Sequence, residues 1–197
     1  MPPVSSLLLF TAVATVTPGG ATTLAAASGA RFGYARSVPL MLGIAVGLAS
    51  LAAVSAAGLG GLLLAVPALQ LAVKIVGSLY LLWLAWRIAR SGAPAQGAGA
   101  QAAPTSFVGG ACLLWLNPKG WAMTLGAAAS FAMLAQGPFG LAVLLGVSFG
   151  VAAAISLSLW CALGMVFARL LSTPAHWRVV NIGMAVLLAL SIVPTWR

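Results

Sequence analysis

The 197-residue sequence contains no aspartate and no glutamate, and it has one histidine and two cysteines. The net charge of +9 therefore reflects missing acidic residues, since charged residues are only 5% of the chain. The lysines and arginines are scattered and form no basic stripe, which argues against a nucleic-acid-binding surface. An oxygen-rich or Cys/His ligand set is also lacking, which argues against transport of divalent cations and predicts no metal site.

Apolar residues dominate what is present. They make up 62% of the sequence, and the mean hydropathy is +1.14. A soluble domain needs a more polar exterior, whereas an apolar helix of about 20 residues crosses a bilayer. We therefore predict an all-α integral membrane protein with six transmembrane segments. Their approximate bounds are 5–28, 38–64, 67–89, 107–134, 139–168 and 177–195.

Basic residues flank the first, third and fifth links and are absent from the second and fourth. They are Arg31, Arg36, Arg87, Arg90, Arg169 and Arg178. The positive-inside rule then predicts that the odd links face the cytoplasm and that both termini face the periplasm. We expect the first four of these arginines to contact anionic lipids. Because basic residues follow the first apolar run and none precedes it, residues 1–28 are expected to be a retained helix.

The chain reads as two similar halves, residues 1–90 and 107–197, joined by a small-residue cytoplasmic linker at 91–106. The sequence TPGG at 17–20 aligns with NPKG at 117–120, and GIAVG at 43–47 aligns with GVSFG at 146–150. Matches in the same order with a slowly rising offset favour an internal repeat. Because each half would contain an odd number of helices, three, the second half would start from the opposite side of the membrane. This predicts the 3+3 inverted-topology repeat typical of secondary transporters.

Proline and glycine interrupt the first and fourth segments near their midpoints. Proline lacks an N–H and clashes with the preceding turn, and glycine lets the backbone leave the helix. Freed backbone groups cost several kcal/mol in hydrocarbon unless they are bonded, so two related interruptions predict a central substrate site. A simple proline kink is the alternative. The predicted site residues are Thr17, Pro18, Gly19 and Gly20 in the first break and Asn117, Pro118 and Lys119 in the second.

Lys119 is unusual because an ammonium group in mid-segment is costly and the chain has no acidic side chain to pair with it. We interpret it as an anchor for a solute carboxylate or as a group that exchanges a proton. Snorkelling to the interface is the alternative. Asn117 either caps freed backbone groups or binds an amine or hydroxyl of the solute.

Two small-xxx-small patterns predict close helix packing: Gly43 with Gly47, and Gly146 with Gly150. Their matching places in the two halves suggest a shared rocking or dimer interface.

Three stretches resemble the LysE/RhtB family of amino-acid exporters. They read TPGGATTLAAASGARFGYARSVPLMLGIAVG, VKIVGSLYLLWLAWRIAR and SFVGGACLLWLNPKGWAM. They resemble the family's first-helix motif with its basic turn, its third helix, and the NPK signature that opens its second half. The family often continues its first motif with proline and a polar residue, where this chain has Gly20 and Ala21.

The resemblance implies a transporter, not an enzyme, that exports a small amino acid or derivative across the bacterial inner membrane without a cofactor. It also implies a homodimer and protons as a second transported species. The alternative from another class is a membrane thiol/disulfide electron carrier that uses Cys112 and Cys161. The first half has no cysteine, so the symmetric thiol pair expected of such a carrier is missing.

Overall fold

The computed structural model describes residues 4–59, 65–90, 104–170, 173–190 and 192–196. The described residues form seven α-helices and three short helical turns. In chain order these are α1 (Val4–Val16), α2 (Gly20–Val54), η1 (Ser55–Leu59), α4 (Pro67–Ala89), α5 (Phe107–Trp115), α6 (Pro118–Ser130), η2 (Ala132–Leu134), α7 (Gly137–Leu170), α8 (Pro174–Leu190) and η3 (Val193–Trp196). Most of the predicted linker, residues 91–103, lies outside the described part of the chain.

The first and fourth predicted segments are each divided in two, because α1 ends before Pro18 and α5 ends before Pro118. The predicted first link coincides with a kink in α2. Here α2 turns at Gly33, whose φ of 76° and ψ of 175° suit glycine, and the helix resumes directly. We therefore treat α2 as two segments, residues 20–32 and 34–54.

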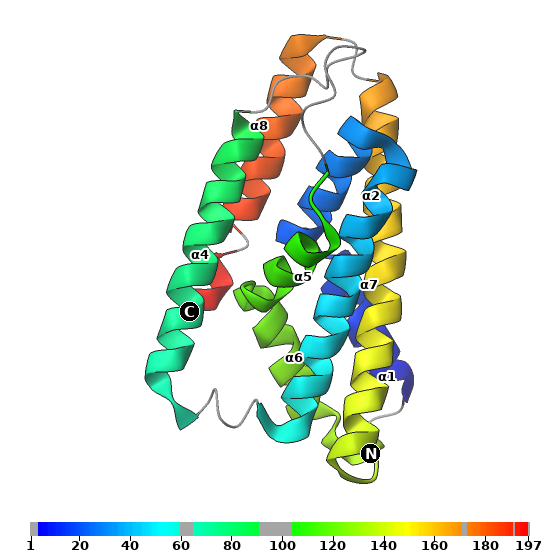
Figure 1. The fold of residues 1–197 in the computed structure, drawn as a ribbon, viewed down its shortest axis with the longest axis vertical. Coiled ribbons are helices and arrows are strands. Elements are labelled where there is room, and N and C mark those ends of the chain that lie inside the picture. The colour runs from blue at the N-terminus through cyan, green and yellow to red at the C-terminus, as the bar shows by residue number, and fades with distance from the viewer. Residues whose placement is uncertain (1–3, 60–64, 91–103, 171–172, 191, 197) are drawn as a thin grey trace.

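The helices run roughly along one long axis, with α2 and α7 side by side on the right of the view (Figure 1). α5 packs on α2, α1 packs on α7, and α4 pairs with α8 on the other side of the bundle. α1 and α6 occupy the lower half of the view, whereas residues 20–32 of α2 occupy the upper half. The two interrupted segments therefore change helix near mid-height and run in opposite directions.

Three described helical spans are long and apolar enough to cross a membrane: Gly20–Gly58, Gln70–Ala89 and Gly137–Leu170. α7 shows the character of such a helix, because it is apolar on every side. Its inward face includes Leu145 and Phe149, which are fully buried, while Val147 and Ile155 on its outward face are more than half exposed. A surface of this kind suits lipid as the surrounding solvent.

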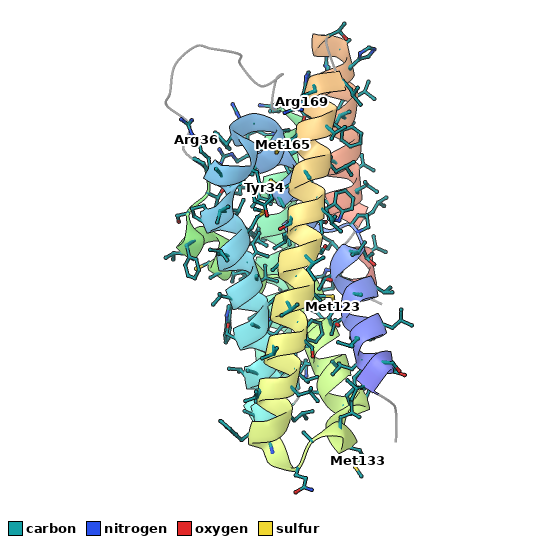
Figure 2. The ribbon with its side chains drawn as sticks, turned by 90° about the vertical axis from the view of Figure 1, so that its right-hand side faces the viewer. Tyr34, Arg36, Met123, Met133, Met165 and Arg169 are labelled. Atoms are coloured by element: carbon teal, nitrogen blue, oxygen red, sulfur yellow. The ribbon has the colours of Figure 1, made fainter. Side chains whose placement is uncertain are left out.

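The two ends of the bundle differ in charge. The turn of α2, the end of α4, the end of α7 and the start of α8 share the upper end in Figure 1. Figure 2 places Arg36 and Arg169 at this end and Met133 at the opposite end. The helix ends next to the three basic links therefore lie together.

The four glycines predicted to pack helices contact other helices of the same chain. A Cβ on Gly43 would overlap the Phe107 carbonyl oxygen of α5, and one on Gly47 would lie 3.0 Å from Ala111 of α5. Cβ atoms on Gly146 and Gly150 would lie 3.3 Å and 3.2 Å from atoms of Ala49 on α2. These glycine faces are therefore covered within one chain, and the homodimer stays a prediction from the family resemblance alone.

Candidate functional site at the paired helix breaks

The first break lies between the end of α1 at Val16 and the start of α2 at Gly20. Thr22, in the first turn of α2, closes this junction. Its Oγ1 accepts a hydrogen bond of 2.8 Å from the Gly19 N–H and donates one of 3.0 Å to the Gly19 carbonyl. Thr22 is buried, so the hydroxyl satisfies backbone groups that the missing helical turn leaves without partners.

The carbonyl groups at the end of α1 are bonded by side chains of α7. Ser156 Oγ donates to the Thr15 carbonyl at 2.8 Å, and Trp160 Nε1 donates to the Val16 carbonyl at 3.1 Å. These bonds meet the requirement that backbone polar groups inside a bilayer find partners in the protein. They also fix the end of α1 against the central helix α7.

The second break lies between the end of α5 at Trp115 and the start of α6 at Pro118. Asn117 is the N-cap of α6, and its Oδ1 accepts a 3.0 Å hydrogen bond from the Lys119 N–H. Pro118 occupies the first helical position, where a missing N–H costs nothing. Asn117 is therefore seen in the capping role, one of the two roles that the sequence left open.

Helix α4 packs closely against the second break at Gly77. A Cβ on Gly77 would overlap the Leu116 carbonyl oxygen and would lie 2.8 Å from Pro118 Cδ. Only a residue without a side chain allows the backbone of α4 to approach the break this closely.

Lys119 connects the two breaks. Its Nζ donates a 2.8 Å hydrogen bond to the carbonyl of Thr17, which follows the last residue of α1. An ammonium group is favoured there because the C-terminal end of a helix carries partial negative charge. The nearest atoms to a Cβ on Gly19 would be Cδ and Nζ of Lys119, both at 3.4 Å. The lysine side chain thus crosses from the second break to the first.

A small cavity of about 40 Å³ lies between the breaks. Five of the seven predicted site residues line it, and Pro18 and Pro118 do not. The five are Thr17, Gly19, Gly20, Asn117 and Lys119. A water molecule needs roughly 10–15 Å³ by this measure, so the cavity has room for a few waters and is too small for an amino acid.

The cavity combines opposite charges at short range. Lys119 is the one titratable side chain among its described lining residues. Gly20 and Thr22 also line it, and the first N–H groups of an α-helix have no carbonyl partner in their own helix. The cavity is therefore lined by the Lys119 ammonium group from the second break and by the N-terminus of α2 and Thr17 from the first break.

Several contributors to this site carry no clear signal in the sequence. Ser156 and Trp160 lie in an otherwise apolar run of α7, where isolated polar atoms are common. The walls also include Ile44 and Leu48 of α2 and Met123 of α6, which are ordinary membrane residues. Only the three-dimensional packing brings them to the breaks.

The two cysteines lie in different surroundings. Cys112 is exposed on α5, Cys161 is buried on α7, and both are free thiols. The Cys161 backbone and Sγ pack against Gly29 of α2, so this thiol lies at a helix contact.

Comparison with known proteins identifies related sequences. A family model described as LysE type translocator matches residues 12–191. Proteins named cysteine/O-acetylserine efflux protein, from Escherichia coli K12 and Shigella flexneri, are each 30% identical over 115 residues. The matched region spans 58% of this chain and 58% of each relative. No solved structure was found to match. Because the family model covers nearly the whole sequence, the chain belongs to the LysE type translocator family.

Proposed function

We propose that this protein exports small neutral amino acids from the cytoplasm across the bacterial inner membrane by alternating access. The observation that carries the proposal is the 2.8 Å contact from Lys119 Nζ to the Thr17 carbonyl beside a cavity between two helix breaks. Interrupted helices are tolerated in a membrane where they line a site. Transporters commonly place such helices at the substrate.

The proposed topology is a 3+3 inverted repeat. The interrupted segment α1 with residues 20–32 corresponds to α5 with α6, residues 34–54 correspond to α7, and α4 corresponds to α8. The opposite directions of the two interrupted segments in Figure 1 support this assignment. The shared position of the basic links supports placing that end in the cytoplasm, with both termini in the periplasm.

The chemistry of the cavity fits a zwitterion. A carboxylate is a better partner for Lys119 than a backbone carbonyl, because both groups of the pair are then charged. The N-terminus of α2 also favours a negative group. Once Lys119 turns to the carboxylate, the Thr17 carbonyl accepts the α-ammonium group of the solute. The amino acid thus replaces one hydrogen bond with two and needs no acidic side chain from the protein.

Solutes with a cationic side chain are disfavoured because the chain has no aspartate or glutamate to neutralise a second positive charge. Ile44, Leu48 and Met123 provide apolar walls for a short side chain. The relatives named for the efflux of cysteine and O-acetylserine have solutes of this size and charge. We therefore expect such neutral amino acids to be transported.

Transport requires the walls of the cavity to move, since the observed volume of about 40 Å³ cannot hold an amino acid. Breaking the contact between Lys119 and Thr17 separates the second break from the first. The solute itself supplies the replacement partners, which couples opening of the site to binding. Protons are a proposed second species, carried through Lys119.

The test is an export assay in proteoliposomes with a panel of labelled amino acids, with and without a proton gradient. We expect saturable transport of small neutral amino acids and little transport of lysine. Failure to transport any amino acid would refute the proposal.

In the same assay, serine at both Cys112 and Cys161 should leave export unchanged. Loss of export in that double variant, with thiol oxidation across the membrane in the wild type, would instead support the electron carrier.

A further inference from the structure

A second pocket lies at the basic end of the bundle, between α2 and α4. Its volume is about 150 Å³, larger than that of the central cavity. Arg31 and Arg87 line it together with the hydroxyl-bearing residues Ser28 and Thr105. No described residue of this lining is acidic, and the chain contains no aspartate or glutamate. Two guanidinium groups in one pocket create a positive potential that an anion would relieve.

We propose that this pocket, here called the basic pocket, binds the carboxylate of the solute before the solute reaches the central cavity. The inference rests on the proposed export function and adds a capture site to it. Arginine suits the role because its planar group bonds both oxygens of a carboxylate. Thr105 offers a further hydroxyl donor, whereas the buried Ser28 hydroxyl is bonded to Ser37.

The basic pocket lies directly along the helix face that leads to the central cavity. On α2, the central cavity is lined by Gly20 and the basic pocket by Leu24, Ser28 and Arg31. Spacings of three and four residues place them on one face. Ser28 lies eight positions after Gly20, which corresponds to about 12 Å along the helix.

The facing side of α4 repeats this order. A Cβ on Gly20 would lie 2.8 Å from Leu81 Cδ2, so Leu81 meets α2 at the level of the central cavity. One turn further on, Leu84 lines the basic pocket, and Arg87 follows at its rim. Apolar side chains thus separate the two sites, and they would have to part for the solute to pass.

The floor of the basic pocket argues for a solute over a lipid headgroup. It consists of Leu40, Leu84 and Ile88, which are buried inside the bundle. The exposed residues of α4 that face outward, such as Leu82 and Trp86, do not line it. A pocket floored by the bundle interior is open to a small molecule, whereas an acyl chain would have to leave the lipid phase.

The test compares two double variants in proteoliposomes. Arg31→Gln with Arg87→Gln removes the charges of the basic pocket. Arg36→Gln with Arg90→Gln is the matched control, because it removes two charges from the same links outside the pocket. Arg87 and Arg90 each stack on a tryptophan four residues earlier, at 5.0 Å and 4.6 Å from the ring centroid, so these two arginines also match in local packing.

For solute presented at the basic end, we expect the pocket variant to raise the KM of export about tenfold, equivalent to about 1.4 kcal/mol. The maximal rate of the pocket variant should equal that of the wild type. The control variant should have both the KM and the maximal rate of the wild type. Equal KM values in both double variants would refute the capture site while leaving the export function standing. Absence of transport by the wild type would refute both.

A comparison of vesicles with and without anionic lipid distinguishes a solute carboxylate from a lipid headgroup in the basic pocket. The tenfold effect should be the same in vesicles of phosphatidylcholine alone and in vesicles that also contain phosphatidylglycerol. An effect that occurs only with phosphatidylglycerol would show that the pocket holds a lipid headgroup, and would overturn the proposal.

Discussion

Replacement of Lys119 by methionine tests the contact between the two breaks most directly. Methionine has a similar length and fits an apolar environment, but it cannot donate the 2.8 Å hydrogen bond to the Thr17 carbonyl. Thr17 lines a cavity with room for a few water molecules, and a water can replace the lost donor, so the substitution should not prevent folding. We therefore expect normal membrane insertion and normal yield of purified Lys119→Met protein.

The expected functional loss follows from the carboxylate that Lys119 would bind. A hydrogen bond to a charged group contributes about 1.5–3 kcal/mol, which corresponds to a rise of roughly ten- to a hundredfold in KM. Export from proteoliposomes at a series of solute concentrations measures this change. Lys74→Met is the matched control, because Lys74 is the other lysine of the chain and its Nζ lies 6.0 Å from the Trp196 ring centroid, outside the cavity. If the two variants export with the same KM, Lys119 does not hold the solute.

Three further variants test the helix breaks. Alanine at both Gly19 and Gly20 should stiffen the first break and lower the maximal export rate at normal protein yield; a normal rate would mean that the break is only a kink. Gly77→Ala should push α4 away from the second break and destabilise the protein by about 1–3 kcal/mol, seen as a lower thermal midpoint in detergent. Gly183→Ala is the control, since nothing lies within 4 Å of its added Cβ, and equal midpoints would contradict the close approach at Gly77. Ser156→Ala should cost about 1–3 kcal/mol by leaving a buried carbonyl without its donor, and an unchanged midpoint would show that water replaces the hydroxyl.

The membrane class and the family could be inferred from the sequence because both depend on local patterns. The apolar runs, the absence of acidic residues and the NPK motif are all visible in the order of residues. The first link was predicted from its polar and basic residues, but the tightness of the turn at Gly33 was not, because these residues resemble those of an ordinary loop. A single residue with positive φ allows the helix to turn there and resume without a separate loop.

The direction of Lys119 could not be decided from sequence. A lysine in mid-segment can extend either to the membrane interface or to the other break. Which direction it takes depends on where the carbonyl groups at the end of α1 lie. The structure places Nζ at the Thr17 carbonyl. Similarly, Arg31 and Arg87 were expected only to contact lipid. Their shared pocket follows from the packing of α2 against α4, which residue spacing within one helix cannot reveal.

The attachment of α1 to α7 determines which parts of the protein can move independently. The carbonyls of Thr15 and Val16 are held by one hydroxyl and one indole of α7, and no solute group could substitute for either donor without displacing α7 itself. We therefore expect α1 to move together with α7, although the two belong to different halves of the sequence. A moving unit of this kind would combine one helix from each half of the proposed repeat.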